Sequence, residues 1–243
     1  MNSQRLWTLS GLSLLPLSAI IAAEKVVFQF PDSGQRLAPF VEMVMGFSLI
    51  AILPALLLMC TAFVRLLVVF GILRNAIGTG RIPPNSVLIM LALMLTAFIM
   101  MPTFMELNEK ALNPYLEGDQ DYKEAISSGK LIINNFMLQY ANEDDLLLFQ
   151  DMSQSEAPEK IEDLSFFVVA PAFMLGELRR GFTIGFLLYI PFLLIDLLTA
   201  SVLMSMGMMM LPPTMISLPI KLLLFVLIDG WRLLVTSLVQ GFS

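Results

Sequence analysis

The feature that most constrains this chain is a set of apolar stretches that are long enough to cross a bilayer but contain prolines and charges. A bilayer span needs roughly 20 apolar residues. The long stretches are Phe40–Leu73, Ser86–Met105, Phe182–Met206 and Met215–Val239, and a shorter one is Phe166–Leu175. Of the 243 residues, 57% are hydrophobic and 14% are charged, against about 45–50% and about 25% in soluble domains. The composition predicts a membrane-associated protein.

Breaks within these stretches predict kinked helices that pack against protein rather than lipid. Prolines 54, 191 and 219 interrupt three of the stretches, and the link over residues 74–85, RNAIGTGRIPPN, holds two glycines and two prolines. Broken helices and internal charges need protein or water around them inside a membrane. We therefore predict an all-α fold of kinked hydrophobic helices and helical hairpins that pack against other subunits.

Acidic residues are concentrated in the middle of the chain. Residues 106–163 contain fourteen acidic and four basic side chains, so this segment belongs in water. Its apolar residues recur in groups separated by polar ones, which favours amphipathic helices over strands. The predicted organisation is N-terminal hydrophobic helices over residues 24–105, an acidic extracytoplasmic helical segment over 106–165, and C-terminal hydrophobic helical hairpins over 166–243.

The first 23 residues have the outline of a secretory signal peptide. Arg5 precedes an apolar run, and the run ends in the small residues Ala22 and Ala23 before Glu24. This order of a basic, an apolar and a small-residue region is typical of cleaved leaders. We expect cleavage near Ala22 or Ala23, and the alternative is an uncleaved first membrane helix.

Basic residues suggest a topology. Lys and Arg near membrane segments favour the cytoplasm, so the link with Arg74 and Arg81 is predicted inside, and residues 24–39 and 106–165 outside. The same arrangement leaves the basic pair Arg179–Arg180 on the outer side. This conflict again indicates that the helices are not simple rods surrounded by lipid.

The residue inventory excludes most kinds of catalysis. Histidine is absent and Cys60 is the one cysteine, which removes histidine-based nucleophile pairs, zinc sites and an internal disulfide. The net charge of -6 argues against nucleic-acid binding. Asp196 and Asp229 lack the glycine-lined turn of an aspartyl protease. We predict no enzyme, no catalytic residue, no metal and no cofactor.

A methionine-rich turn follows the third long stretch. Five of the seven residues from 204 to 210 are methionine, and Gly207 and Pro212–Pro213 lie beside them. Methionine is flexible and packs adaptably. Repeated around a ring of subunits, such a turn would form a soft apolar constriction that blocks ions by dewetting. The alternative is ordinary core packing at a tight turn. The candidate residues are Met204, Met206, Met208, Met209 and Met210.

Charged residues inside the apolar stretches are candidates for assembly. An ionisable group in a membrane segment needs a partner, and Asp196 could pair with Lys221 or with Arg65, within the chain or across subunits. Asp229 and Arg232 are three residues apart and could pair on one helix face. Glu177 and Arg180 have the same spacing, so pairing with each other and docking to a partner are both open. The docking candidates are Glu177, Arg179 and Arg180.

The chain strongly resembles the FliP family, the export-gate proteins of bacterial flagella with counterparts in virulence injectisomes. The resemblance is carried by residues 171–231, PAFMLGELRRGFTIGFLLYIPFLLIDLLTASVLMSMGMMMLPPTMISLPIKLLLFVLIDGW. Further matches are AFVRLLVVFGILRNAIGTGRIPPN at 62–85, LALMLTAFIMMP at 91–102 and FMLQYANEDDLLLF at 136–149. Together they cover most of the chain from about residue 60 onward, and a combination of this length is highly specific.

The resemblance implies a core subunit of the flagellar type III export gate, through which unfolded flagellar subunits leave the cytoplasm. It implies that five copies assemble with FliQ and FliR into a closed, helically staggered cone, linked to FlhB and FlhA. The cone would lie in the flagellar basal body at the bacterial inner membrane, with its bulk toward the periplasm. The methionine-rich turn would be the gasket of the pore. The alternative function is a small-molecule or ion transporter with Asp196 and Lys221 at a broken helix.

Overall fold

The structure is a computed structural model. It describes residues 58–80, 82–154, 160–208 and 210–242, together with residues 43–44, 47–48, 51 and 158. The chain divides into two units, residues 1–51 and 52–243, and every helix named below belongs to the second. The predicted signal peptide, with Ala22 and Ala23, lies outside the described residues, as does Met209.

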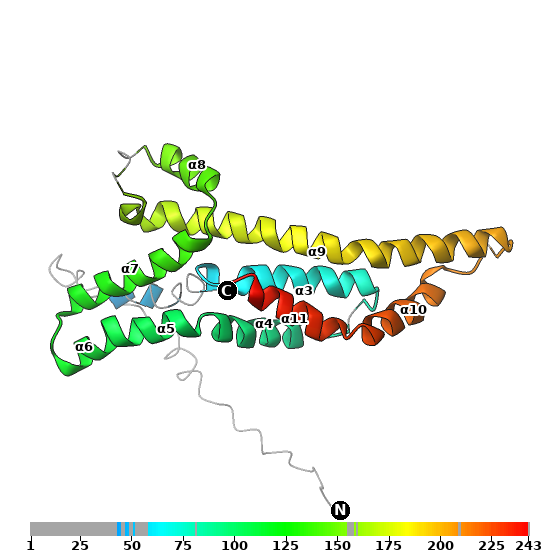
Figure 1. The fold of residues 1–243 in the computed structure, drawn as a ribbon, viewed down its shortest axis with the longest axis horizontal. Coiled ribbons are helices and arrows are strands. Elements are labelled where there is room, and N and C mark those ends of the chain that lie inside the picture. The colour runs from blue at the N-terminus through cyan, green and yellow to red at the C-terminus, as the bar shows by residue number, and fades with distance from the viewer. Residues whose placement is uncertain are drawn as a thin grey trace, which may run out of the picture. The chain divides into compact units, whose positions relative to one another are not determined.

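Two helices form the centre of the fold. α3 (Phe63–Ile77) and α9 (Phe166–Ser205) run side by side and make the most extensive helix pair (Figure 1). Apolar side chains recur every three or four residues along α3, so they share one face of the helix. That face packs against the first half of α9. The fully buried residues of this contact are Leu66, Val69, Phe70, Val169, Ala172 and Phe173.

α9 corrects one expectation from the sequence. The stretches Phe166–Leu175 and Phe182–Met206 are not separate: α9 is a single helix of 40 residues that passes through the charges between them and through Pro171 and Pro191. Each proline removes one backbone hydrogen bond, but contacts with neighbouring helices hold both sides of the interruption. Near Pro191, for example, Phe192 is buried and its ring lies 6.3 Å from that of Phe225.

The remaining apolar stretches form bent helices. α4 (Asn85–Ile99) and the run that begins with α5 (Met101–Leu107) meet at 57°, and α10 (Thr214–Leu227) and α11 (Gly230–Gln240) meet at 61°. Among the described residues, α9 is by length and composition the one single helix that could cross a membrane, and up to three segments could do so if each bent pair is one span. The prediction of an all-α fold with kinked hydrophobic helices is confirmed for the described residues.

The acidic segment folds into short helices against this centre. A π-helix (Asn108–Leu112) and α6 (Asn113–Glu117) continue α5, and the chain turns back into α7 (Tyr122–Tyr140), which packs against α5, the π-helix and α9. α8 (Glu143–Ser153) lies on α9, and a short 3-10 helix (Ile161–Asp163) follows. Apolar residues from one face of α7 enter the core, as the spacing predicts.

Glycines on α9 allow α3 to approach closely. A Cβ added to Gly181 would lie 3.2 Å from the side chain of Val68, and one added to Gly185 would lie 3.0 Å from the Cβ of Ile72 with another Ile72 atom closer still. Small residues four apart let two helix backbones come together. In contrast, a Cβ at Gly71 of α3 would meet open space within the described part of the chain.

We expect Gly185→Ala to destabilise the fold by about 1–3 kcal/mol, because the added methyl overpacks the contact with Ile72. Gly71→Ala is the matched control, since it makes the same change without a clash and raises helix propensity by up to about 1 kcal/mol. Chemical denaturation of the detergent-solubilised protein, followed by circular dichroism, measures both. Equal effects of the two variants would contradict the close α3–α9 contact.

Candidate functional site

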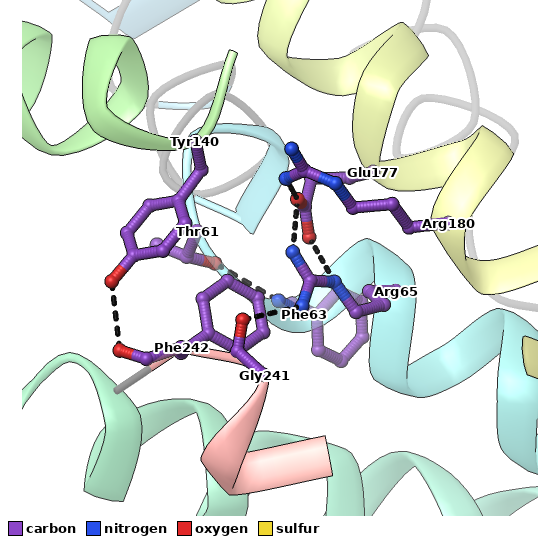
Figure 2. Close-up of polar contacts among 8 residues, drawn as sticks. All are labelled: Thr61, Phe63, Arg65, Tyr140, Glu177, Arg180, Gly241 and Phe242. Carbon is purple, nitrogen blue, oxygen red and sulfur yellow. Dashed lines mark hydrogen bonds and ion pairs between the residues drawn. The ribbon is translucent and has the colours of Figure 1, made fainter. Parts of the chain in front are cut away.

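A buried ion pair joins α3 to α9. The guanidinium of Arg65 donates from Nε to Glu177 Oε2 at 2.7 Å and from Nη2 to Oε1 at 2.5 Å (Figure 2). Their side chains are 3% and 0% exposed. Arg180 Nη1 donates to the same Oε1 at 3.1 Å from the edge of the site. Two-point arginine–carboxylate pairs are strong and directional, so this pair fixes the relative position of the two central helices.

Residues after α11 complete the surroundings of Arg65. Its third nitrogen, Nη1, donates to the carbonyl of Gly241 at 3.2 Å, and its guanidinium lies 3.6 Å from the ring centre of Phe242 (Figure 2). The Tyr140 hydroxyl donates to the Phe242 carbonyl at 2.7 Å. The buried cation is therefore held by a carboxylate, a carbonyl and an aromatic face, which together offset the cost of removing it from water.

A second ion pair ties α10 to α9. Lys221 Nζ donates to Asp196 Oδ2 at 2.6 Å and to the carbonyl of Ala76 at 3.0 Å. The Lys221 side chain is 5% exposed and that of Asp196 is 33% exposed. Ala76 lies in the last turn of α3, where carbonyls lack helical partners and attract cations. Of the two partners that the sequence allows for Asp196, the structure thus selects Lys221.

Sequence reasoning missed a third pair. Arg179 of α9 donates from Nη2 to Oδ1 of Asp145 at 2.8 Å, which holds the start of α8 on α9. Asp145 is buried, whereas Arg179 is half exposed. Asp145 is one of three consecutive acidic residues in the first turn of α8. Acidic residues at this position are already explained by the helix dipole, so the sequence gives no separate sign that Asp145 pairs with Arg179.

Other predicted residues lie elsewhere than expected. Glu177 does not face outward for docking, because Arg65 and Arg180 hold it inside the fold. Asp229 and Arg232 are both exposed, and no ion pair joins them in the described part of the chain. Asp229 is not inside a helix but at the bend before α11, with φ +52°. The helical geometry that the three-residue spacing assumes is therefore absent at that point.

The methionine-rich turn is built around Gly207. Gly207 has φ +76°, its N–H donates to the Met204 carbonyl at 3.1 Å, and the N–H of Met208 donates to the Leu203 carbonyl at 3.0 Å. These two bonds form a Schellman motif, which ends α9 and needs glycine at the left-handed position. Met204, Met206 and Met208 are exposed, and Met210 is 98% exposed. In this single chain the turn is therefore an apolar surface, not core packing.

These features suit assembly rather than chemistry. The charged side chains of the three pairs are bound to one another, and the methionines offer a deformable apolar surface. Among the described residues no group of three or more potential ligands is placed to hold a metal ion.

Comparison with known proteins covers most of the chain. A sequence model of the FliP family matches residues 47–238. The flagellar biosynthetic protein FliP of Caulobacter vibrioides is 50% identical over 232 residues, which is 95% of this chain and 86% of that protein. The proteins of the same name from Bacillus subtilis and Aquifex aeolicus are 44% and 41% identical; the matches cover 86% and 96% of this chain and 94% and 99% of those proteins.

We expect Glu177→Ala to destabilise the fold by about 3–5 kcal/mol, because it leaves the Arg65 cation buried without its carboxylate. Arg180→Ala is the control from the same site, and its exposed contact should contribute less than about 1 kcal/mol. The double variant Arg65→Met with Glu177→Leu should recover much of the loss, since it leaves no unpaired charge. Thermal unfolding in detergent measures all three. A Glu177→Ala loss no larger than that of Arg180→Ala would show that the pair is not central.

Proposed function

The chain belongs to the FliP family, and from this premise we propose that it is a core subunit of the flagellar type III protein export gate. Its relatives carry the name flagellar biosynthetic protein, which supports a role in flagellum assembly. In this proposal five copies assemble with FliQ and FliR, and FlhB and FlhA adjoin them in the basal body at the inner membrane. Unfolded flagellar subunits pass through the pore that the copies enclose.

The observation that carries the assembly part of the proposal is the apolar exterior of α9. Only 11% of the most apolar 18-residue segment of the helix is buried within the chain. Monomeric soluble proteins rarely expose contiguous apolar surface of this kind. Lipid or neighbouring subunits must cover the second half of the helix. From residue 182 to residue 202 the exposed large apolar side chains are those of Phe182, Phe186, Leu187, Ile190, Leu193, Leu194, Leu197, Leu198 and Val202.

The charged residues have a supporting role in this proposal. The pair of Lys221 and Asp196 holds α10 against α9, and this contact keeps the outer apolar face of each helix in place for neighbouring subunits. Arg179 and Arg180 are partly exposed, and we assign them to docking of a partner. Asp229 and Arg232, exposed in the single chain, are available for charged contacts across a subunit boundary.

The methionine-rich turn is the part of the chain that we assign to the constriction of the pore. It lies at the end of α9, between two helices, and its described methionines face solvent. In a ring of copies these side chains would meet and form a constriction that excludes water. Because methionine has three flexible bonds and a polarizable sulfur, the seal could deform around a passing polypeptide and close after it. Met204, Met206, Met208, Met209 and Met210 are the proposed gasket.

The transporter alternative depends on a solute site at Asp196 and Lys221. In the structure Lys221 is almost completely buried, and its ammonium is already held by Asp196 and by the Ala76 carbonyl. This geometry favours a structural pair, so the export gate remains the one function that we propose.

Replacing Met208, Met209 and Met210 together by alanine should raise ion leakage across the membrane while secretion of flagellar subunits continues. The smaller side chains no longer fill the constriction, but the pore and its neighbours remain. Leakage is measured by membrane-potential dyes in intact cells, and secretion by the flagellar subunits found in the culture medium. Met152→Ala is the control, since Met152 is 67% exposed on α8, away from the turn. Leakage equal to that of Met152→Ala would contradict the gasket.

A further inference from the structure

α11 begins at a sharp corner. The chain bends by 61° between α10 and α11, and Asp229 at the bend has φ +52°, in the left-handed region that residues with side chains seldom adopt. The next residue must be glycine, because a Cβ at Gly230 would overlap the ring of Phe225, with its Cζ at 2.8 Å. The corner is therefore a defined feature of the backbone, and the two residues between the helices are Ile228 and Asp229.

The other end of α11 is fastened at one point. Gly241 and Phe242 lie between Arg65 and Tyr140, as Figure 2 shows. The ring of Phe242 lies under the Arg65 guanidinium at 3.6 Å and meets the Tyr140 ring edge-on at 5.1 Å. Two hydrogen bonds to the carbonyls of Gly241 and Phe242 complete the attachment. Four contacts of three kinds thus converge on two residues.

Between its two ends α11 packs on the core through a narrow face. In its first turn the Trp231 ring lies 6.4 Å from that of Phe70 and 5.5 Å from that of Phe225. Further along, Leu234 and Leu238 enter the core, but the outer side of the helix is exposed. A cavity of about 380 Å³ lies along it against α9 and α10, lined in part by Leu188 and Phe192. A second cavity, of about 530 Å³, separates its end from α4 and α5. Side chains that line a cavity lose contacts on that side, so the two ends contribute a large share of the attachment.

We propose that residues 230–242 form a latch, which opens as a unit about Asp229 and Gly230 and is held closed by Phe242 on Arg65 and Tyr140. Segments with few buried contacts open locally while the rest of a protein stays folded. Opening removes the Phe242 ring from the Arg65 guanidinium and exposes the buried ion pair to water. The closed latch therefore shields this ion pair from water, whereas the backbone hydrogen bonds within α3 and α9 do not depend on it.

The latch is connected to the methionine-rich turn through α10. The turn leads directly into α10, and α10 leads into the corner at Asp229. α10 has 14 residues and is held along its length by Lys221, which binds Asp196 of α9 and the Ala76 carbonyl of α3. The latch is a property of the fold and is tested by itself, apart from the proposed function.

Hydrogen–deuterium exchange of the detergent-extracted complex, read by mass spectrometry, tests the latch. In the unsubstituted protein, peptides of α11 should exchange faster than those of α3. Phe242→Ala should accelerate exchange in α11 by about tenfold or more, because it removes both ring contacts, with less than about twofold change in α3 and α9. Leu233→Ala is the control on the same helix; Leu233 is 58% exposed, and its loss should leave α11 exchange unchanged.

Tyr140→Phe is the second test of the latch, for use if the Phe242→Ala variant does not assemble. It keeps both rings and removes one hydrogen bond, so α11 exchange should rise by about threefold while α3 and α9 stay unchanged. Unchanged exchange in α11 would overturn the latch. So would equal acceleration in α3, α9 and α11, since that would mean general destabilisation. Neither result depends on ion leakage, which tests the gate separately.

Discussion

The ion pair between Arg65 and Glu177 is the interaction on which the rest of the structure depends. It places two full charges between the apolar faces of two helices, and such charges are tolerated because each satisfies the other in two-point geometry. Because Glu177 is neutralised by Arg65, α9 continues as one helix through the charged residues between its two apolar stretches. The ion pair also provides the cation on which Phe242 rests, so the central helix pair, the end of α11 and α7 are held at one place.

The buried charged side chains are paired inside the chain, and the surface of the second half of α9 is left apolar. The Lys221–Asp196 and Arg179–Asp145 pairs likewise connect helices of the same chain. The second half of α9 and the methionine-rich turn, in contrast, expose large hydrophobic side chains. In such a protein the ion pairs connect helices of one chain, and apolar surface remains that another molecule must cover. In the proposed gate, neighbouring copies and other subunits cover that exterior and bring the methionine-rich turns together.

Local patterns in the sequence predict part of this account. Composition and periodicity predict the all-α fold. Because Asp196 lies in an apolar stretch and needs a cationic partner, the sequence also limits that partner to Lys221 or Arg65. The continuity of α9 is not predicted, because Glu177 appears as an interruption until its partner, 112 residues earlier, is known. Tyr140, Asp145 and Phe242 are missed for the same reason, since a contact across the fold leaves no spacing in the chain. Proline is misleading at Pro191, where tertiary contacts outweigh one lost hydrogen bond.

Our central proposal is that copies of this chain and other subunits cover its exposed apolar surface and together enclose a conduit. The most direct test is the mass of the complex extracted from membranes in mild detergent, measured by native mass spectrometry. We expect a large assembly that contains several copies of this chain together with other export-gate subunits. A chain that is extracted as a stable, folded monomer with only bound lipid would contradict the account.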